Sequence, residues 1–132
     1  MDISVIKERV RYGETDQMGV AYHGAYSQWF EIGRTEFCKM KGVVYKELER
    51  SGYGLVVVEL FINYKRPLRY DEEFEIHTYV EEINKKMIKF GYRIIKDSKI
   101  CATGYTKHLF ILLSSFKSTD APEEVINCFL NK

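Results

Sequence analysis

One segment of this 132-residue chain, residues 22–40, reads YHGAYSQWFEIGRTEFCKM. Its large apolar side chains recur at spacings of three, four or seven with few gaps, and they are Tyr26, Trp29, Phe30, Ile32, Phe37 and Met40. Polar residues such as Gln28, Arg34 and Lys39 occupy much of the remainder. Because a helix turns once every ~3.6 residues, this pattern gathers apolar side chains on one side. The segment is therefore predicted to form one long amphipathic helix whose apolar face needs a cover.

The segments around this helix indicate what covers it. Residues 5–12 alternate in character and predict one strand, and four stretches rich in β-branched and aromatic residues predict four more: 55–65, 74–83, 87–96 and 100–113. The breaks between the last three are short, which favours antiparallel neighbours joined by tight turns. We expect an α+β domain in which one antiparallel sheet covers the long helix.

Two shorter helices complete the pattern. Gly42 is expected to end the long helix, and residues 45–50 predict a short helix closed by Gly52, because glycine tolerates the left-handed conformation that ends helices. Residues 121–130 predict a terminal helix with Pro122 and acidic residues in its first turn. The side chains expected to face inward from it are Val125, Ile126, Phe129 and Leu130.

Length and charge exclude several classes of protein. The chain fits one domain, residues 1–132, of a size that buries roughly two-thirds of its unfolded surface. Its 20 basic and 19 acidic side chains give a formal net charge of +1 and are spread along the sequence, which argues against nucleic acid or an anionic membrane as a partner. No apolar run reaches the roughly 18 residues of a membrane span, and the charged start does not resemble a signal peptide. We expect a soluble protein.

Cysteine usage and missing motifs narrow the chemistry. Cys38, Cys101 and Cys128 are odd in number and widely spaced, which predicts neither a disulfide framework nor a zinc site and favours a reducing cytoplasm. The sequence has no glycine-rich nucleotide loop and no serine elbow, which argues against a dinucleotide-binding enzyme, a P-loop enzyme or a serine hydrolase. No metal or redox cofactor is required.

The polar, glycine-punctuated loop before the long helix is the candidate active site. Asp16 lies seven residues ahead of His23; it either begins a simple Asx-turn or serves as a general base or nucleophile. His23 is either an ordinary structural histidine or the start of an oxyanion-binding site. In the second case the unpaired N–H groups of His23 and Gly24, at the first helical positions, polarise a carbonyl. Gly24 would let a substrate approach the backbone closely.

Charged residues on the strands give weaker signals. Glu59 interrupts an apolar strand and is interpreted as facing outward, with a groove-facing acid as the alternative. Lys65, Arg66 and Arg69 surround Pro67 at a strand end, where they are simply solvated or receive phosphates. His77 and His108 lie within strand patterns without an evident partner and are assigned no role.

Two stretches resemble a known family. Residues 10–26, VRYGETDQMGVAYHGAY, and residues 64–71, YKRPLRYD, are similar to the hotdog-fold acyl-CoA thioesterases of the 4-hydroxybenzoyl-CoA thioesterase and YbgC type. The resemblance covers nearly the whole chain. It implies a curved antiparallel sheet wrapped around the long helix, with Asp16 as the catalytic carboxylate and His23 opening the helix. Glu14 stands where the family commonly has an Asp, and Ala25 where an Asn often follows the histidine.

The resemblance implies hydrolysis of an acyl-CoA thioester, with acyl carrier protein as another possible carrier. Tyr22, Tyr26 and Val57 are expected to line an apolar acyl groove, and Lys65 and Arg66 to reach the nucleotide end. It also implies a homo-oligomer, a dimer or a tetramer, with sites at subunit interfaces. Two other functions are weighed against hydrolysis: a hotdog dehydratase, whose His and acid arrangement finds no match here, and a non-catalytic acyl-thioester binding or assembly subunit.

Overall fold

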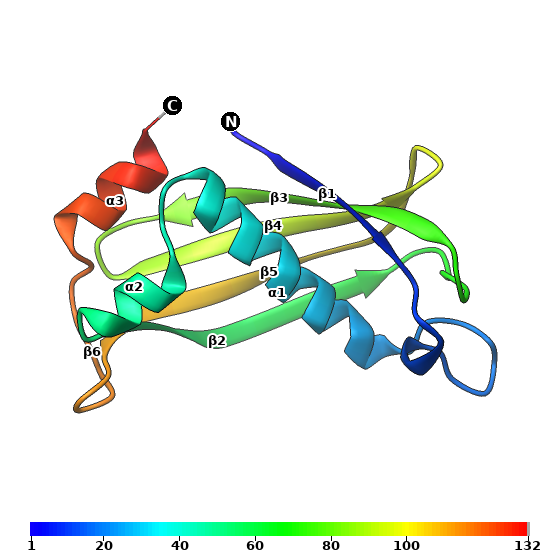
Figure 1. Cartoon of the computed structure of the whole chain (residues 1–132), viewed down its shortest axis with the longest axis horizontal. Helices are drawn as coiled ribbons and strands as arrows, with labels where there is room; N and C mark the ends of the chain where they lie inside the picture. Colours follow the sequence, from blue (N-terminus) through cyan, green and yellow to red (C-terminus); the bar gives the residue numbers. More distant parts are fainter. Residues whose placement is uncertain (132) are drawn as a thin grey trace.

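A curved antiparallel sheet holds one long helix against its face in the computed structural model, which describes residues 1–131 (Figure 1). The helices are α1 (His23–Met40), α2 (Tyr45–Arg50) and α3 (Glu123–Leu130), and a single 3₁₀ turn spans Tyr12–Glu14. The strands are β1 (Ser4–Arg9), β2 (Tyr53–Tyr64), β3 (Glu73–Ile83), β4 (Met87–Lys96), β5 (Lys99–Leu112) and the two-residue β6 (Lys117–Ser118). The expected α+β fold, with a sheet wrapped around the long helix, is confirmed.

The strands lie in the order β1-β3-β4-β5-β2, and β6 pairs with the last two residues of β5, Ile111 and Leu112. All five pairings are antiparallel. The edges of the sheet are therefore β1 and the twelve-residue β2. Register shifts in β2, between Val57 and Glu59, and in β3, between Val80 and Glu82, add local twist and help the sheet to curve around α1.

The apolar face of α1 supplies the centre of the core. Trp29, Phe30 and Phe37 are all at least 98% buried. The Phe30 ring stacks on Tyr92 of β4 with centroids 4.1 Å apart, and the Trp29 ring packs on Phe74 of β3 at 4.4 Å. Each such ring contributes roughly 1.5–3 kcal/mol through burial, so packing against the sheet, more than helix propensity, stabilises α1.

Two expectations about the elements are wrong in detail, and one short strand was not expected. The first strand ends at Arg9 instead of residue 12, because the Arg11 N–H donates to Glu14 Oε1 and turns the chain into the 3₁₀ helix. Leu130 is 60% exposed, since the sheet-facing side of the eight-residue α3 is already filled by Phe129 and its neighbours Val125 and Ile126. The strand β6 is too short to produce a sequence pattern.

His108 gives the fold a pH dependence. Its side chain is 1% exposed, and burial together with the nearby Arg34 cation lowers its pKa to about 3 from an ordinary 6.5. The folded state therefore keeps this imidazole neutral where the unfolded chain binds a proton, so stability falls as the pH drops from about 6.5 towards 3. The expected loss from this group is about 1 kcal/mol per pH unit within that window.

Urea unfolding of the parent and of His108→Gln at a series of pH values measures this contribution. The variant should show a shallower decline of the unfolding free energy below pH 6.5. Parallel declines in the two proteins would mean that His108 is not the group responsible.

Candidate active site

The loop between the 3₁₀ turn and α1 is closed by its own backbone. The Asp16 N–H donates to the Val20 carbonyl at 3.0 Å, and the Gly19 N–H donates to the Asp16 carbonyl at 2.9 Å. Gly19 has φ +80°, a left-handed conformation that a glycine adopts without strain. The Ala21 N–H donates to the carbonyl of Leu68 at 2.7 Å and fastens the loop to the segment after β2. The loop therefore holds Asp16 in a defined place.

One of the two carboxylate oxygens of Asp16 is hydrogen-bonded within the loop. Its Oδ1 accepts a hydrogen bond from the Met18 N–H at 2.9 Å, which is the Asx-turn weighed above. Its Oδ2 makes no hydrogen bond with any part of residues 1–131, and the side chain is only partly buried. The turn and a chemical role are therefore compatible: one oxygen orients the carboxylate and the other is available.

The N-terminus of α1 lies at the end of the same loop. Tyr22 is the N-cap, and its side chain makes no capping hydrogen bond. The first backbone bond of the helix runs from the Ala25 N–H to the Tyr22 carbonyl at 3.0 Å, so within residues 1–131 nothing accepts from the N–H groups of His23 and Gly24. Two unpaired donors at the positive end of an 18-residue helix favour a partial negative charge in front of them.

Gly24 lies directly beneath the side chain of Tyr22. The ring of Tyr22 folds over it, and a Cβ at position 24 would lie 2.6 Å from Tyr22 Cε2. The His23 side chain is exposed, with its ring at the edge of Tyr22 at 6.0 Å between centroids. The Tyr64 hydroxyl of β2 donates to the His23 carbonyl at 3.1 Å and ties the helix start to the sheet edge.

Glu14 and Trp29 support the site in a way that the sequence interpretation missed. Glu14 is 9% exposed; its Oε1 accepts from the Arg11 N–H at 2.8 Å and its Oε2 from Trp29 Nε1 at 3.0 Å. The Glu14 carbonyl also accepts from the Tyr22 N–H at 2.9 Å. One buried residue thus joins the 3₁₀ turn, the helix start and the core. No local sequence pattern pairs Glu14 with Trp29, and Arg11 lacks the side-chain acceptor of a capping box, so the sequence offered no signal for this role.

Val57 and Tyr26, two of the residues expected to line the acyl groove, differ in exposure. Val57 lies on the face of the sheet that faces α1, because its register partner is the buried His108, and it is still 43% exposed. Tyr26 is 3% exposed and packs between Trp29 and Tyr64, so it backs the site from the core instead of lining a surface. Burial raises the pKa of Tyr26 to about 12, which keeps its hydroxyl protonated.

Glu59 lies on the outer face of the sheet, away from α1. It pairs in register with Lys107, its carboxylate lies 3.7 Å from the Lys107 ammonium, and it accepts from the Tyr105 hydroxyl at 3.3 Å. Glu59 therefore lies on the outward side that the sequence interpretation favoured, and a role for it in substrate binding stays a prediction. Lys65 and Arg66 are exposed directly after β2, where both N–H groups donate to the Cys101 carbonyl.

Comparison with known proteins identifies the family. Residues 10–129 match the thioesterase-like superfamily, and the chain belongs to it. The chain is 37% identical over 118 residues to YneP of Bacillus subtilis, which covers 89% of this chain and 86% of that one. It is 30% identical over 122 residues to the acyl-CoA thioesterase YbgC of Haemophilus influenzae, covering 92% and 90% of the two chains.

Solved structures of other proteins resemble this chain in both fold and sequence. A hypothetical protein from Thermus thermophilus is 32% identical, with a TM-score of 0.92 over 96% of this chain and 97% of that one. A DHNA-CoA thioesterase from Staphylococcus aureus is 33% identical, with a TM-score of 0.88 over 91% and 81% of the two chains. The hotdog fold and the relationship to YbgC-type thioesterases implied by the sequence motifs are confirmed.

Two further findings concern residues 1–131. No helix among them combines the length and the apolar character needed to cross a membrane. Nor do they hold three or more His, Cys, Asp or Glu side chains grouped as a metal ion would need.

Proposed function

We propose that this protein hydrolyses an acyl-CoA thioester to a carboxylic acid and CoA. One observation carries the proposal: a partly free carboxylate, Asp16, and an unpaired helix N-terminus at His23 and Gly24 belong to one rigid loop-helix unit. The family of the chain, and the acyl-CoA thioesterases among its relatives, support the same reaction.

The two parts of the unit divide the chemistry. The N–H groups of His23 and Gly24 hydrogen-bond to the thioester oxygen and stabilise the negative charge that develops on it. Asp16 either removes a proton from a water molecule as that water attacks the carbonyl carbon, or attacks the carbon itself to form a mixed anhydride that water then opens. In both routes the carbon–sulfur bond breaks and CoA departs as a thiolate. The exposed His23 side chain either orients the thioester or assists the departing thiolate.

The acyl chain is proposed to lie along an apolar strip of β2 formed by Val57, Leu60 and Tyr64, called here the β2 strip. Their register partners, His108, Thr106 and Ala102, are all buried, which places the strip on the face that α1 occupies. Each member is nevertheless 43–50% exposed, because α1 packs against β3, β1 and β4 and leaves the edge strand uncovered. Exposed Lys65 and Arg66, next along the chain, suit the phosphates of CoA.

We also propose that a second copy of this chain pairs with β2. A long edge strand with exposed apolar side chains at Val58, Leu60 and Phe61 is a template for another strand. Sedimentation equilibrium of the parent should give a dimer or a dimer of dimers, and Val58→Lys should shift the mass towards the monomer. The matched control is Val5→Lys on the other edge strand, 52% exposed, which should leave the mass unchanged. A monomeric parent would contradict this arrangement.

The test of the reaction is thiol release from short, medium, long and aromatic acyl-CoA esters, with the corresponding acyl carrier protein thioesters beside them. Turnover identifies a thioesterase, ranks the acyl groups and names the carrier. Tight binding of acyl-CoA without thiol release from any ester would contradict hydrolysis and indicate the non-catalytic binding subunit.

A further inference from the structure

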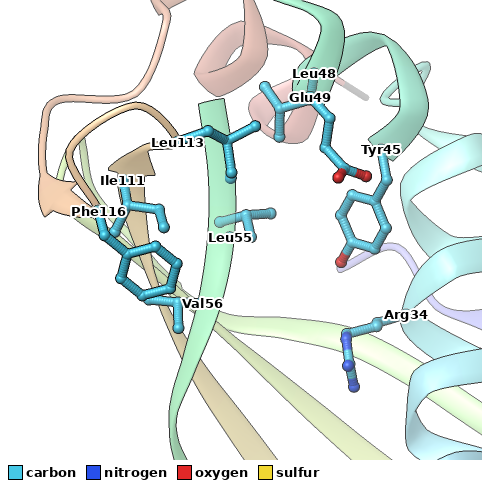
Figure 2. Close-up of a pocket in the computed structure, with 10 residues that line it drawn as sticks. Arg34, Tyr45, Leu48, Glu49, Leu55, Val56, Ile111, Leu113 and Phe116 are labelled. Carbon is cyan, nitrogen blue, oxygen red and sulfur yellow. The ribbon is translucent and has the colours of Figure 1, made fainter. Parts of the chain in front are cut away.

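A pocket lies at the other end of α1, far from Asp16. It has a volume of about 270 Å³ between α1, α2, the first half of β2 and the end of β5. Figure 2 shows its walls, which are mostly apolar and include Leu48, Leu55, Ile111, Leu113 and Phe116. Arg34, Tyr45 and Glu49 are the polar side chains among the lining residues, and in Figure 2 Arg34 lies at the lower edge of the group.

Arg34 is a cation without a carboxylate partner. It is partly buried and forms no salt bridge with any of residues 1–131. Its guanidinium lies near the neutral hydroxyls of Tyr92 and Tyr45. The Tyr92 hydroxyl shares a hydrogen bond of 2.5 Å with Thr106 Oγ1. These neighbours carry no charge, and none of residues 1–131 places a carboxylate within salt-bridge distance of the guanidinium.

The Tyr45 hydroxyl is a second polar group of this pocket that lacks a hydrogen-bonding partner among the described residues. The oxygen is buried, and none of the described residues gives it a hydrogen bond of good geometry; the Cys38 thiol is among its neighbours but is a weak partner. Burial raises the pKa of Tyr45, so the group remains a hydroxyl donor. In Figure 2 this hydroxyl points from α2 towards Arg34. A buried donor beside an uncompensated guanidinium matches a carboxylate, which a guanidinium binds through two parallel hydrogen bonds.

Two carboxylates of this protein, those of Glu49 and Glu31, are candidates for an ion pair with Arg34. Glu49 lines the pocket, but it is exposed, and in Figure 2 its carboxylate lies on the other side of the Tyr45 ring from Arg34. Glu31, one turn earlier on α1, raises the pKa of Arg34 through its charge yet forms no ion pair with it and is exposed. Neither carboxylate forms a salt bridge with Arg34.

The β2 strip connects this pocket with the proposed catalytic end. Leu55 lines the pocket, and its register partner Phe110 is buried, which places Leu55 on the same face of β2 as the β2 strip. At the other end of the strip, the Tyr64 hydroxyl donates to the His23 carbonyl. Arg34 follows His23 by eleven residues on α1, so the two ends are roughly 16 Å apart at a rise of ~1.5 Å per residue. With carbon–carbon bonds of about 1.5 Å, an extended acyl chain needs about a dozen carbons to span that distance.

We propose that the pocket binds a carboxylate at the far end of a long acyl chain, and hence that the enzyme prefers long ω-carboxyacyl-CoA thioesters. This inference rests on the proposed thioesterase function. Arg34 pairs with the distal carboxylate, Tyr45 donates a further hydrogen bond to it, and the apolar walls enclose the last methylene groups. A short acyl group, with or without a second carboxylate, does not reach Arg34.

The test compares matched thioesters in the parent and in Arg34→Met, which keeps the length of the side chain and removes its charge. The substrates are tetradecanedioyl-CoA, tetradecanoyl-CoA, hexanedioyl-CoA and hexanoyl-CoA. In the parent, kcat/KM for the long diacid ester should exceed that for the long monoacid ester about 10- to 100-fold, the worth of a charge-assisted hydrogen bond. Arg34→Met should reduce this ratio to about one without changing the two short substrates.

Two further variants serve as controls for Arg34→Met. Arg34→Lys keeps the charge without the planar fork and should retain part of the preference. Lys39→Met removes an exposed cation of α1 that is 3.7 Å from Glu36 and outside the pocket, and it should retain the parent ratio. Far-UV circular dichroism and thermal melting show whether Arg34→Met is folded. If it is not folded, the proposal is tested by the ratio of kcat/KM for the long diacid ester to that for the long monoacid ester, measured in the parent and in Arg34→Lys.

The outcomes separate the two proposals. Hydrolysis of both long esters at similar rates by the parent would overturn the pocket assignment and leave the thioesterase standing. If no ester is hydrolysed, the thioesterase proposal fails, and calorimetry with free tetradecanedioate decides the pocket alone. Binding of that diacid by the parent, weakened at least about tenfold in Arg34→Met, supports the assignment, and equal binding by the two proteins overturns it.

Discussion

Replacing Asp16 by Asn is expected to lower kcat for acyl-CoA hydrolysis about 100- to 10,000-fold, the range typical of a lost general base. The fold should be unchanged, because the Asn side-chain oxygen can still accept from the Met18 N–H and keep the Asx-turn. What the variant loses is the charge and basicity of the carboxylate, and with them both proposed routes of attack. The defect should therefore appear in kcat, while binding of acyl-CoA is preserved.

The measurement is thiol release under saturating acyl-CoA, with the thermal midpoint recorded for each protein. Asp97→Asn is the matched control: Asp97 is exposed in the turn between β4 and β5 with φ 51°, a conformation that Asn tolerates well. That variant should retain full activity. Full activity in Asp16→Asn instead would remove Asp16 from the mechanism and leave the helix N-terminus as the main source of rate enhancement.

The chain order made part of this site predictable. Asp16, His23 and Gly24 lie within nine residues, so a loop that ends where a helix begins must bring them close together. The helical period of residues 22–40 and the short breaks between strands were equally local signals, and the elements they predicted are present. Local patterns predict these features because the apolar periodicity of a helix or strand marks the same face that its packing in the fold buries.

The rest depends on contacts that no local pattern encodes. Glu14 meets Trp29 across fifteen residues, and Tyr64 reaches the His23 carbonyl across forty-one. The side of the sheet on which Glu59 lies is a further case. In a regular strand Glu59 would share the face of Val57, but the bulge between them inserts one residue and turns Glu59 outward. The Arg34 and Tyr45 pocket likewise forms only when α2 packs beside β2.

Gly33→Ala is expected to destabilise the protein by about 2 kcal/mol, within the range for an overpacked core. At Gly33 the backbone of α1 approaches β3 so closely that an added Cβ would lie 2.4 Å from Thr78 Oγ1 and 2.8 Å from Ile76 Cγ2. Both neighbours are fully buried and β-branched, so neither can rotate away easily. Alanine itself favours a helix by about 1 kcal/mol over glycine, and the clash with two rigid neighbours is expected to outweigh that gain.

Urea unfolding of three variants distinguishes this clash from a general effect of losing a glycine. Gly13→Ala adds a Cβ that meets nothing within 4 Å and should change the unfolding free energy little. Thr78→Ala removes the nearer obstacle, so Gly33→Ala should cost less free energy in a Thr78→Ala background than in the parent, and the double-mutant cycle should show favourable coupling between the two positions. Additive free energies would mean that α1 moves away from β3 to admit the methyl group, and that the contact at Gly33 does not set the distance between helix and sheet.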